Sequence, residues 1–345
     1  MKKKKIGIIG YGIVGKRRRQ YIDAHPSLET VCVSDVRFDP EHFVIDGLQA
    51  CSDHKSLLET DVDAIFVSVP NYLAPEITIA GIEKGIHIFC EKPPGCSVED
   101  IQMVMRAEQA HPHVVLKYGF NHRYHNSIQE ALRIIYSGEL GEIINMEGIY
   151  GKGRIVDPKL SAWRSERKYA GGGILLDQGI HMLDLMRLFC GEFTDVRSFI
   201  TNDYWHHDVE ENAFALMKDK RGRIASIHSS ATLWEHGFSL HVYLTEGYLK
   251  LSGILTGSKS YGEETLIIGR RSDSDHGTLE STTIKYLEDN SWKQEIDEFA
   301  DAITEQVPIK FGTSHDALET MKLVYRIYYA DPVWRTKYNI SNPDQ

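Results

Sequence analysis

Three side chains, of which Lys92 is far in the sequence from the other two, have the types that oxidation of an alcohol requires. Lys92 precedes two prolines, and Asp177 and His181 stand four residues apart in a segment with a helical apolar pattern. That spacing places Asp177 and His181 on one helix face. An imidazole can take a hydroxyl proton as hydride leaves the carbon, and an ammonium can stabilise the oxygen that becomes negative. Lys92, Asp177 and His181 are therefore the candidate catalytic residues, with Asp177 orienting either the substrate or His181.

The Asp/His segment has two other interpretations. Asp184 lies three residues beyond His181, and apolar residues surround all three polar groups. One alternative is therefore an internal hydrogen-bonded pair within the core. The other is a metal site, whose third ligand would have to come from elsewhere, since the sequence shows no H-E-x-x-H pattern. No metal is expected.

A glycine pattern near the N-terminus predicts a nucleotide site. The residues from Gly10 to Gly15 have the form G-x-G-x-x-G, between a predicted strand and a predicted helix. Such a turn lets the backbone approach a pyrophosphate at a helix N-terminus. Asp35 follows 20 residues after Gly15, where a carboxylate accepts hydrogen bonds from the ribose hydroxyls of NAD. Its charge disfavours the 2′-phosphate of NADP, although Arg37 could soften that exclusion. A tight turn followed by a solvated Asp35 is the alternative.

Two further strand ends complete the expected cofactor site. Pro70-Asn71 ends the third predicted strand, and Glu91-Lys92-Pro93-Pro94 ends the fourth. Ligands of parallel sheets bind at the carboxyl ends of the strands, and the proline after Lys92 restricts the backbone of that lysine. A solvated surface lysine is the alternative. The residues expected to bind the cofactor are Gly10, Tyr11, Gly12, Ile13, Val14, Gly15, Asp35, Arg37, Pro70, Asn71, Glu91 and Lys92.

The first 120 or so residues alternate between strand and helix patterns. The expected strands are 5–9, 31–34, 64–69, 86–90 and 114–118, and the expected helices are 13–24, 74–84 and 97–110. Ser97 is the expected N-cap of the last helix, with Asp100 as its capping-box partner. Strands without clean alternation, separated by helices, indicate a parallel sheet covered on both faces. We therefore predict a doubly wound α/β domain over residues 1–122.

The pattern changes after a predicted helix at 126–137. Alternating runs are typical of an antiparallel sheet with one face covered by helices; they occur at 142–151, 194–202, 210–218, 223–233, 238–245, 248–254 and 264–269. Two closing helices are expected at 291–306 and 314–330. Residues 123–345 are thus predicted to form an α+β domain with a large, mainly antiparallel open sheet. Its last helices could pack back on the first domain. Without a linker, the two domains are expected to pack closely and share a cleft.

Composition excludes several classes of protein. The chain has 345 residues, with 39 basic and 49 acidic side chains and a net charge of −10. Such a chain lacks the basic surface that nucleic acids require, and no apolar run has the roughly 20 residues that span a bilayer. The apolar run after the lysines at 2–5 is too short for a secretory signal. The five cysteines show no Cys-x-x-Cys pattern, so buried thiols in a reducing cytoplasm are expected.

In combination, these motifs resemble the glucose–fructose oxidoreductase/inositol dehydrogenase/rhizopine-catabolism (Gfo/Idh/MocA) family. The matching residues run through nearly the whole chain: Gly10-x-Gly12-x-x-Gly15, Asp35, Pro70-Asn71, Glu91-Lys92-Pro93, Gly119-Phe120-Asn121-His122-Arg123-Tyr124 and Gly171-Gly172-Gly173-x-x-x-Asp177-x-Gly179-x-His181-x-x-Asp184. The resemblance implies a Rossmann domain, a second domain whose sheet forms homodimers or homotetramers, and NAD(P)-dependent redox at a secondary alcohol. It implies Lys92, Asp177 and His181 as the catalytic set. It also implies that Arg123, Trp163 and Arg164 lie near the substrate, together with Asp177 and His181.

The resemblance narrows the expected substrate to a sugar, polyol or nucleotide sugar. The Asp-Gln-Gly-Ile-His sequence at 177–181 is similar to members from surface-polysaccharide and nucleotide-sugar pathways. One departure is Ala74, followed by Pro75, where many relatives have a histidine. Two other functions stay open: a non-catalytic NAD-binding sensor or scaffold, against which the intact catalytic set argues, and an NAD-dependent glycosidase of the same fold.

Three remaining clusters are interpreted mainly as structural or surface residues. The polar run from Trp205 to Glu211 is expected to be a solvated turn, since adjacent histidines in an extended segment point to opposite faces. His122 and His125 are interpreted either as substrate contacts or as plain surface. The tyrosines at 325, 328 and 329 have helical spacing and are expected to pack in the core.

Overall fold

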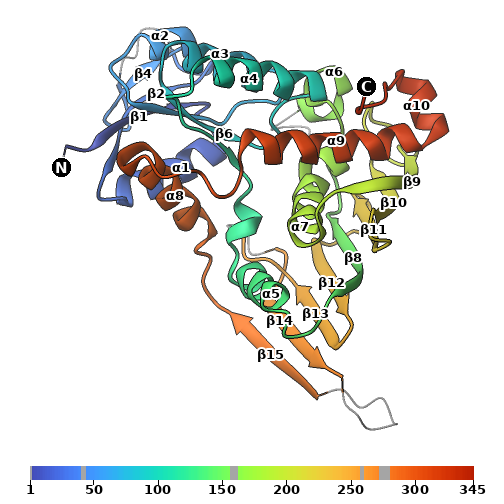
Figure 1. The fold of residues 1–345 in the computed structure, drawn as a ribbon. Coiled ribbons are helices and arrows are strands. Elements are labelled where there is room, and N and C mark those ends of the chain that lie inside the picture. Colours follow the sequence, from blue (N-terminus) through green and yellow to red (C-terminus); the bar gives the residue numbers. More distant parts are fainter. Residues whose placement is uncertain (1, 40–43, 156–161, 257–259, 272–279) are drawn as a thin grey trace. The chain divides into compact units, whose positions relative to one another are not determined.

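The computed structural model describes residues 2–39, 44–155, 162–256, 260–271 and 280–345 (Figure 1). Within these ranges the chain forms two compact units. The first contains residues up to Asn121 together with Trp292–Leu318, and the second contains His122–Ser291 with Glu319–Gln345. The sequence-based division at residue 122 placed 292–318 in the second domain, with the last helices able to pack back. In the structure, residues 292–318 belong to the first unit.

The first unit is built on a seven-stranded sheet with the strand order β3-β4-β2-β1-β5-β6-β7. All neighbours pair in parallel except β3 and β4, which are antiparallel. Its elements are β1 (Lys4–Ile9), α1 (Ile13–Ala24), β2 (Leu28–Ser34), β3 (Val44–Ile45), β4 (Leu48–Cys51), α2 (His54–Leu58), β5 (Ala64–Val67), α3 (Ala74–Glu83), β6 (His87–Glu91), α4 (Val98–Ala110), β7 (Leu116–Gly119) and α8 (Ser291–Glu305). The predicted doubly wound sheet is confirmed.

The core of the first unit includes a helix from late in the sequence. Phe66 of β5 and Phe89 of β6 stack with ring centroids 4.6 Å apart, and Phe299 of α8 meets both rings edge-on. All three side chains are buried. Aromatic pairs of this geometry stabilise a core beyond the area they bury. Helix α8 therefore belongs to the hydrophobic core of the Rossmann-like unit.

Helix α4 begins as its sequence predicts. The Ser97 hydroxyl accepts a hydrogen bond from the Asp100 backbone N–H at 3.2 Å, and the Asp100 carboxylate accepts one from the Ser97 N–H at 2.9 Å. This reciprocal pair satisfies two of the N–H groups that a helix start leaves without partners. The predicted capping box is confirmed.

The second unit is built on an eight-stranded sheet with the order β15-β14-β13-β12-β8-β11-β10-β9. Within the described residues, β8 and β11 are the only neighbours in this sheet that pair in parallel, and the other pairs are antiparallel. Its elements are a short 3-10 turn (Asn121–Tyr124), α5 (Asn126–Ser137), β8 (Ile143–Gly151), a second 3-10 turn (Ala162–Ser165), α6 (Arg167–Ala170), a π-helical turn (Leu175–Gly179), α7 (Ile180–Cys190), β9 (Phe193–Thr201), β10 (Asn212–Asp219), β11 (Ile224–Ser230), β12 (Gly237–Leu244), β13 (Gly247–Ser252), β14 (Glu264–Arg270), β15 (Glu280–Tyr286), the greater part of α9 (Ser314–Ala330) and α10 (Pro332–Tyr338). The start of α9, up to Leu318, belongs to the first unit.

The two faces of this sheet differ. Helix α7 lies against the face to which β8 contributes Met146 and Tyr150, and both side chains are buried. The opposite face leaves large apolar side chains 43–78% exposed, namely Ile149, Phe199, Phe214, Leu216 and Ile224. Because side chains alternate along a strand, this pattern identifies one helix-covered face and one open face. The predicted open, mainly antiparallel sheet is confirmed.

The glycine-rich segment before α7 is not the continuous helix that the sequence predicted. Helix α6 ends at Ala170, and a π-helical turn over Leu175–Gly179 precedes α7. Glu210 explains the start of this segment, because its carboxylate accepts hydrogen bonds from the N–H groups of Gly173 at 2.7 Å and Leu175 at 3.0 Å. Asp177 thus lies in the wider π turn and His181 in the first turn of α7.

The prediction that the polar run from Trp205 to Glu211 is a solvated turn is wrong for its two glutamates. Glu210 and Glu211 are buried, whereas the neighbouring His206 and Asp208 are exposed. Glu210 also accepts a hydrogen bond from the Tyr328 hydroxyl, and Glu211 accepts one from the Trp205 N–H. Buried carboxylates require such donors. This loop therefore holds the glycine-rich segment in place.

The expected burial is found for one of the three tyrosines of α9 and for most of the cysteines, whereas Tyr325 and Tyr329 are partly exposed. Tyr328 is fully buried, and four of the five free cysteines are buried while Cys96 is partly exposed. Burial raises the pKa of the Cys90 thiol to about 12, so that thiol stays protonated at neutral pH. Among the helices in the described ranges, none combines the length and apolarity that crossing a bilayer demands.

Candidate active site

The glycine turn between β1 and α1 forms an open cradle. Gly10 adopts a φ of 88°, and a Cβ on Gly15 would lie 2.2 Å from the Gly10 carbonyl oxygen. Both positions therefore require glycine. Gly12 is the N-cap of α1 and provides no side-chain hydrogen bond to the first helical N–H groups. A helix start with glycine at its cap fits a pyrophosphate, which needs N–H donors and close backbone approach.

Asp35 stands beside this turn and is engaged by two partners. Its Oδ2 accepts a hydrogen bond from the Tyr11 N–H at 3.0 Å, and Arg37 donates to both carboxylate oxygens at 2.7 Å. Burial alone would raise the pKa of the Asp35 carboxyl, but the hydrogen bonds from Arg37 and Tyr11 outweigh burial and lower that pKa. Asp35 is therefore an ionised acceptor at neutral pH, while the Arg37 side chain is 68% exposed.

The other expected cofactor residues follow β5 and β6. Pro70 and Asn71 come shortly after β5, and Lys92 follows directly on Glu91, the last residue of β6. Strands β2, β1, β5 and β6 are consecutive neighbours in the sheet and all run parallel. Their carboxyl ends therefore share one edge of the sheet, which is where ligands bind in this type of fold. Ala74, where the resemblance leads one to expect a histidine, and the following Pro75 begin α3 and are buried.

Glu91 belongs to a buried ionic cluster. Its Oε1 accepts a hydrogen bond from Arg18 Nε at 2.6 Å, and Nη1 of the same arginine lies 2.7 Å from Glu295 Oε2. Arg18 and Glu295 are fully buried. Burial raises the pKa of the Glu295 carboxyl to about 7, against the lowering effect of Arg18.

This raised pKa makes stability depend on pH. In the unfolded chain Glu295 loses its proton near pH 4.5, whereas in the folded state it keeps the proton to about pH 7. The folded state binds more protons in this window, so this carboxyl's contribution to stability is lost as pH rises through 7. Glu295→Gln removes the ionisation, so the free energy of unfolding of the variant relative to wild type should rise between pH 5 and pH 8, by up to about 3 kcal/mol. Denaturation curves of both proteins at several pH values test this, and a difference independent of pH would contradict it.

In the second unit His181 stacks on another histidine. The rings of His181 and His122 are 3.7 Å apart between centroids and nearly parallel, at 8°. His122 Nε2 lies 3.0 Å from the Tyr150 hydroxyl at the end of β8. The three side chains are at most 5% exposed. His122 is therefore not a surface residue, and it fixes the plane of the candidate catalytic imidazole.

Asp177 is held by two cations that flank the glycine-rich segment. Lys152 Nζ lies 3.2 Å from Oδ2, and Arg164 Nε lies 3.6 Å from Oδ1. The Arg164 guanidinium also lies over the Trp163 ring, 4.5 Å from its centroid. The structure thus brings together three residues of the expected site and adds Lys152. Its signal in the sequence is a lysine between Gly151 and Gly153 at the end of a strand.

Two tyrosines beside this group are unsuited to act as bases. Gln178 Nε2 donates to the Tyr261 hydroxyl at 2.5 Å, and the rings of Tyr261 and Tyr150 lie 5.4 Å apart. Burial raises the pKa of Tyr261 to about 12 and that of Tyr150 well above its usual value. Both hydroxyls stay protonated at neutral pH. Among these groups, the imidazole of His181 therefore remains the candidate for the proton transfer.

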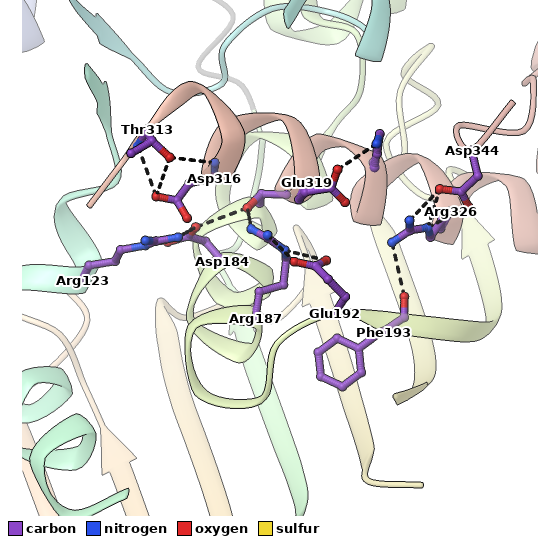
Figure 2. A network of polar contacts seen from close by, with 12 residues as sticks. Arg123, Asp184, Arg187, Glu192, Phe193, Thr313, Asp316, Glu319, Arg326 and Asp344 are labelled. Carbon is purple, nitrogen blue, oxygen red and sulfur yellow. Dashed lines mark hydrogen bonds and ion pairs between the residues drawn. The ribbon is translucent and has the colours of Figure 1, made fainter. Parts of the chain in front are cut away.

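The guanidinium of Arg123 binds a carboxylate of its own unit. It makes a bidentate pair with Asp184 at 2.7 and 2.6 Å (Figure 2). Asp184 Oδ1 also accepts a hydrogen bond from Thr320, which in turn accepts one from Arg187. Such a pair satisfies two buried charges. Asp184 thus binds Arg123. The aspartates and the histidine of the predicted Asp/His segment therefore have different partners.

His125 is the remaining candidate near this region. Its Nδ1 lies 2.9 Å from the Glu264 carboxylate, and both side chains are buried. The interpretation of His125 as plain surface is therefore wrong. The histidine ties the start of α5 to β14, because Glu264 also accepts a hydrogen bond from the Ser127 N–H.

Comparison with known proteins identifies the family. An oxidoreductase family model with an NAD-binding Rossmann fold matches residues 4–120, and a model of the Gfo/Idh/MocA C-terminal domain matches residues 128–250. The chain belongs to the Gfo/Idh/MocA family. As in other members, its first unit is an NAD-binding Rossmann domain. The expected family, fold class and cofactor class are confirmed.

Several relatives of this Gfo/Idh/MocA chain carry the names of enzymes that act on carbohydrates. A 1,5-anhydro-D-fructose reductase of Ensifer adhaerens is 34% identical over 64% of this chain and 66% of its own length. A levoglucosan dehydrogenase of Pseudarthrobacter phenanthrenivorans is 27% identical over 57% of this chain and 53% of its own length. A solved structure of levoglucosan dehydrogenase with NADH has a TM-score of 0.83 at 20% identity, covering 96% of this chain and 98% of that one. This last similarity shows a shared fold.

Proposed function

We propose that this protein is an NAD(P)-dependent oxidoreductase that transfers hydride at a secondary hydroxyl or keto carbon of a sugar, polyol or nucleotide sugar. The observation that carries the proposal is the pairing of Asp177 with Lys152 and Arg164 beside the buried His181. A carboxylate between two cations suits hydrogen bonding to sugar hydroxyls. Membership of an oxidoreductase family and the names of the relatives support the same class of reaction.

In the direction of oxidation, His181 takes the proton of the reacting hydroxyl. The C–H electron pair leaves as hydride, the C–O bond becomes a carbonyl, and the proton stays on the imidazole until it passes to solvent. Bound NAD supplies the hydride acceptor. In the reverse direction His181 returns the proton to the new alkoxide, so that one residue serves as base and acid.

Asp177 and Lys92 have supporting roles in this proposal. Asp177 accepts hydrogen bonds from sugar hydroxyls, and its pairing with Lys152 and Arg164 fixes its direction. Lys92 donates a hydrogen bond to the reacting oxygen, whose negative charge increases as the proton leaves. Trp163 lies under Arg164 and is half-buried, so it would limit the far side of the substrate.

The glycine turn and Asp35 would hold the cofactor, and NAD is the preferred form in this proposal. Asp35 is ionised and bound to the turn by Tyr11, so it repels a 2′-phosphate. Ile13 is 74% exposed and Val14 is 37% exposed at the start of α1, where backbone N–H groups face a pyrophosphate. Pro70, Asn71 and Glu91 complete the same sheet edge.

The proposal is tested by a substrate panel followed at the nicotinamide absorbance. The panel should include 1,5-anhydro-D-fructose with NADH and NADPH, levoglucosan with NAD⁺ and NADP⁺, and simple and nucleotide-linked sugars. We expect cofactor turnover that depends on one carbohydrate class, with higher kcat/KM for the NAD form. NAD binding without turnover across the panel would contradict the proposal and favour a sensor.

We further propose that the open face of the second sheet joins two copies of the chain into a homodimer or homotetramer. Its exposed apolar side chains form a contiguous set on neighbouring strands, which monomeric proteins rarely leave in water. Phe214→Asp is expected to convert the oligomer to monomer in analytical ultracentrifugation, because a charge there opposes burial. Tyr136→Asp on α5, a position 71% exposed, is the matched control. A monomeric wild type, or an unchanged Phe214→Asp oligomer, would contradict this assembly.

A further inference from the structure

The buried ionic cluster of the first unit joins three elements next to the candidate catalytic lysine. Arg18 comes from α1, three residues after the last glycine of the turn, Glu91 ends β6, and Glu295 comes from α8. Arg18 lies between the two carboxylates, 2.6 Å from Glu91 and 2.7 Å from Glu295. The next residue after Glu91 is Lys92. The cluster thus connects the phosphate-binding turn to the corner that bears the lysine.

Aromatic rings fix the guanidinium of Arg18 in its place. Its Cζ lies 4.4 Å from the centroid of Phe89 and 4.2 Å from that of Trp292. A planar cation in contact with aromatic faces is held in position and in orientation. On the remaining side, a Cβ at Gly119 would lie 2.9 Å from Glu91 Oε2 and 3.1 Å from Arg18 Nη2. The ion pair therefore occupies a space that only glycine at position 119 leaves open.

Stability alone is a weak explanation for such a cluster. Burying charges costs solvation that their attraction regains only in part, and well-packed apolar residues often stabilise a fold as well or better. Here one cation is shared between two carboxylates, and the burial of Glu295 opposes its ionisation. Such an arrangement fixes geometry at the expense of stability.

We propose that Arg18 and Glu295 are positioning residues, which hold Glu91 and through it the direction of Lys92 relative to the glycine turn. Only one part of this inference, the catalytic role of Lys92, rests on the proposed function. Glu91 has no freedom to rotate while Arg18 holds its carboxylate, and the backbone of Lys92 continues from it. A displacement of about 1 Å at such a position can reduce turnover 10²-fold.

A second carboxylate on α8 provides a matched control. Glu298 lies one turn after Glu295 and binds a different cation, Lys117 of β7, at 3.2 Å. It also accepts hydrogen bonds from the backbone N–H groups of Lys310 and Phe311. The charged groups around Glu295 are therefore Arg18 on α1, Glu91 on β6, and Lys117 on β7 beside Glu298. Glu298→Gln disturbs α8 without touching the pair formed by Arg18 and Glu91.

The experiment compares Glu295→Gln with Glu298→Gln at pH 8, where the carboxylate of Glu295 is ionised in the wild type. The first readout is the rate at which an amine-reactive ester labels Lys92, measured by peptide mass spectrometry against Lys84 in the same sample. The second is the division of the activity change between kcat and KM. We expect Glu295→Gln to change Lys92 labelling about 3-fold or more and to lower kcat about 10-fold, with the KM for NADH within about 2-fold. Glu298→Gln should leave labelling and kcat as in the wild type, even if its melting temperature falls.

A second substitution covers the case in which Glu295→Gln folds poorly. Arg18→Lys keeps the charge but loses the planar, stacked guanidinium, so it should reproduce the fall in kcat and the labelling change. Wild-type labelling and kcat in both Glu295→Gln and Arg18→Lys would overturn the proposal, and so would equal losses in Glu295→Gln and Glu298→Gln. If labelling changes as expected but Lys92→Ala turns over normally, positioning stands and the proposed catalytic role of Lys92 fails.

Discussion

Replacing His181 by alanine is expected to lower turnover about 10²-fold or more while NAD still binds. The imidazole is buried, and the hydroxyls of Tyr150 and Tyr261 stay protonated at neutral pH, so neither tyrosine can take over its proton transfer. The nucleotide residues lie in the other unit, so cofactor affinity should be unaffected. Steady-state kinetics with the best carbohydrate of the panel and titration of NADH fluorescence measure the two quantities separately.

Lys92→Ala should show the same division between turnover and cofactor affinity. The surface lysine Lys84, which pairs with Glu59 in the same unit, provides the control, and Lys84→Ala should behave as wild type. Turnover that is unchanged in both His181→Ala and Lys92→Ala would exclude the proposed mechanism. A loss of NAD binding in His181→Ala would instead indicate a structural role for the histidine.

Asp35→Ala changes the preference between the two nicotinamide cofactors. The wild-type carboxylate repels a 2′-phosphate and occupies Arg37 with two hydrogen bonds. The substitution removes the repulsion and leaves an exposed guanidinium beside the glycine turn, where it can pair with a phosphate. The ratio of kcat/KM for NAD to that for NADP is expected to fall about 10-fold or more.

The control for this substitution is another aspartate of the Rossmann unit. Asp53 caps α2 through the Ser56 N–H at 2.8 Å, so Asp53→Ala should lower stability and leave the cofactor ratio unchanged. If Asp35→Ala keeps the wild-type ratio, Asp35 does not contact the adenosine ribose. If both substitutions change the ratio alike, the effect comes from stability.

Local signals made much of the fold predictable. The helices at 13–24 and 126–137 have the predicted bounds, and the capping box at Ser97 forms as expected. Each of these signals lies within a few residues of the structure that it specifies. The glycine pattern followed by Asp35 was also visible in the sequence. In the structure the Tyr11 N–H of the glycine turn donates to Asp35 at one edge of the sheet.

The remaining features depend on partners that are distant in the sequence. Strand β3 has two residues, too few to show a period, and the π-helical turn at 175–179 depends on Glu210, which binds the backbone of the glycine-rich segment. Lys152 has no motif of its own, because its role arises when β8 ends beside Asp177. A polar run such as 205–211 reads as solvated until the donors that bury its carboxylates are known.

Arg123 illustrates the same limit for residues carried over by resemblance. The motif places an arginine near the substrate, whereas in the structure its guanidinium donates two hydrogen bonds to the carboxylate of Asp184, and both side chains are buried. The partner lies 61 residues further along the chain. Spacing alone could not connect the two, because the pair depends on how α7 packs in the second unit.

A crystal structure with NADH and a carbohydrate from the panel would show whether one substrate oxygen meets both Lys92 and His181. We expect Lys92 Nζ and a ring nitrogen of His181 both to lie within hydrogen-bond reach of the same oxygen of the sugar, at about 2.6–3.2 Å. Lys92 and His181 facing away from each other, or apolar side chains filling the space between them, would contradict it.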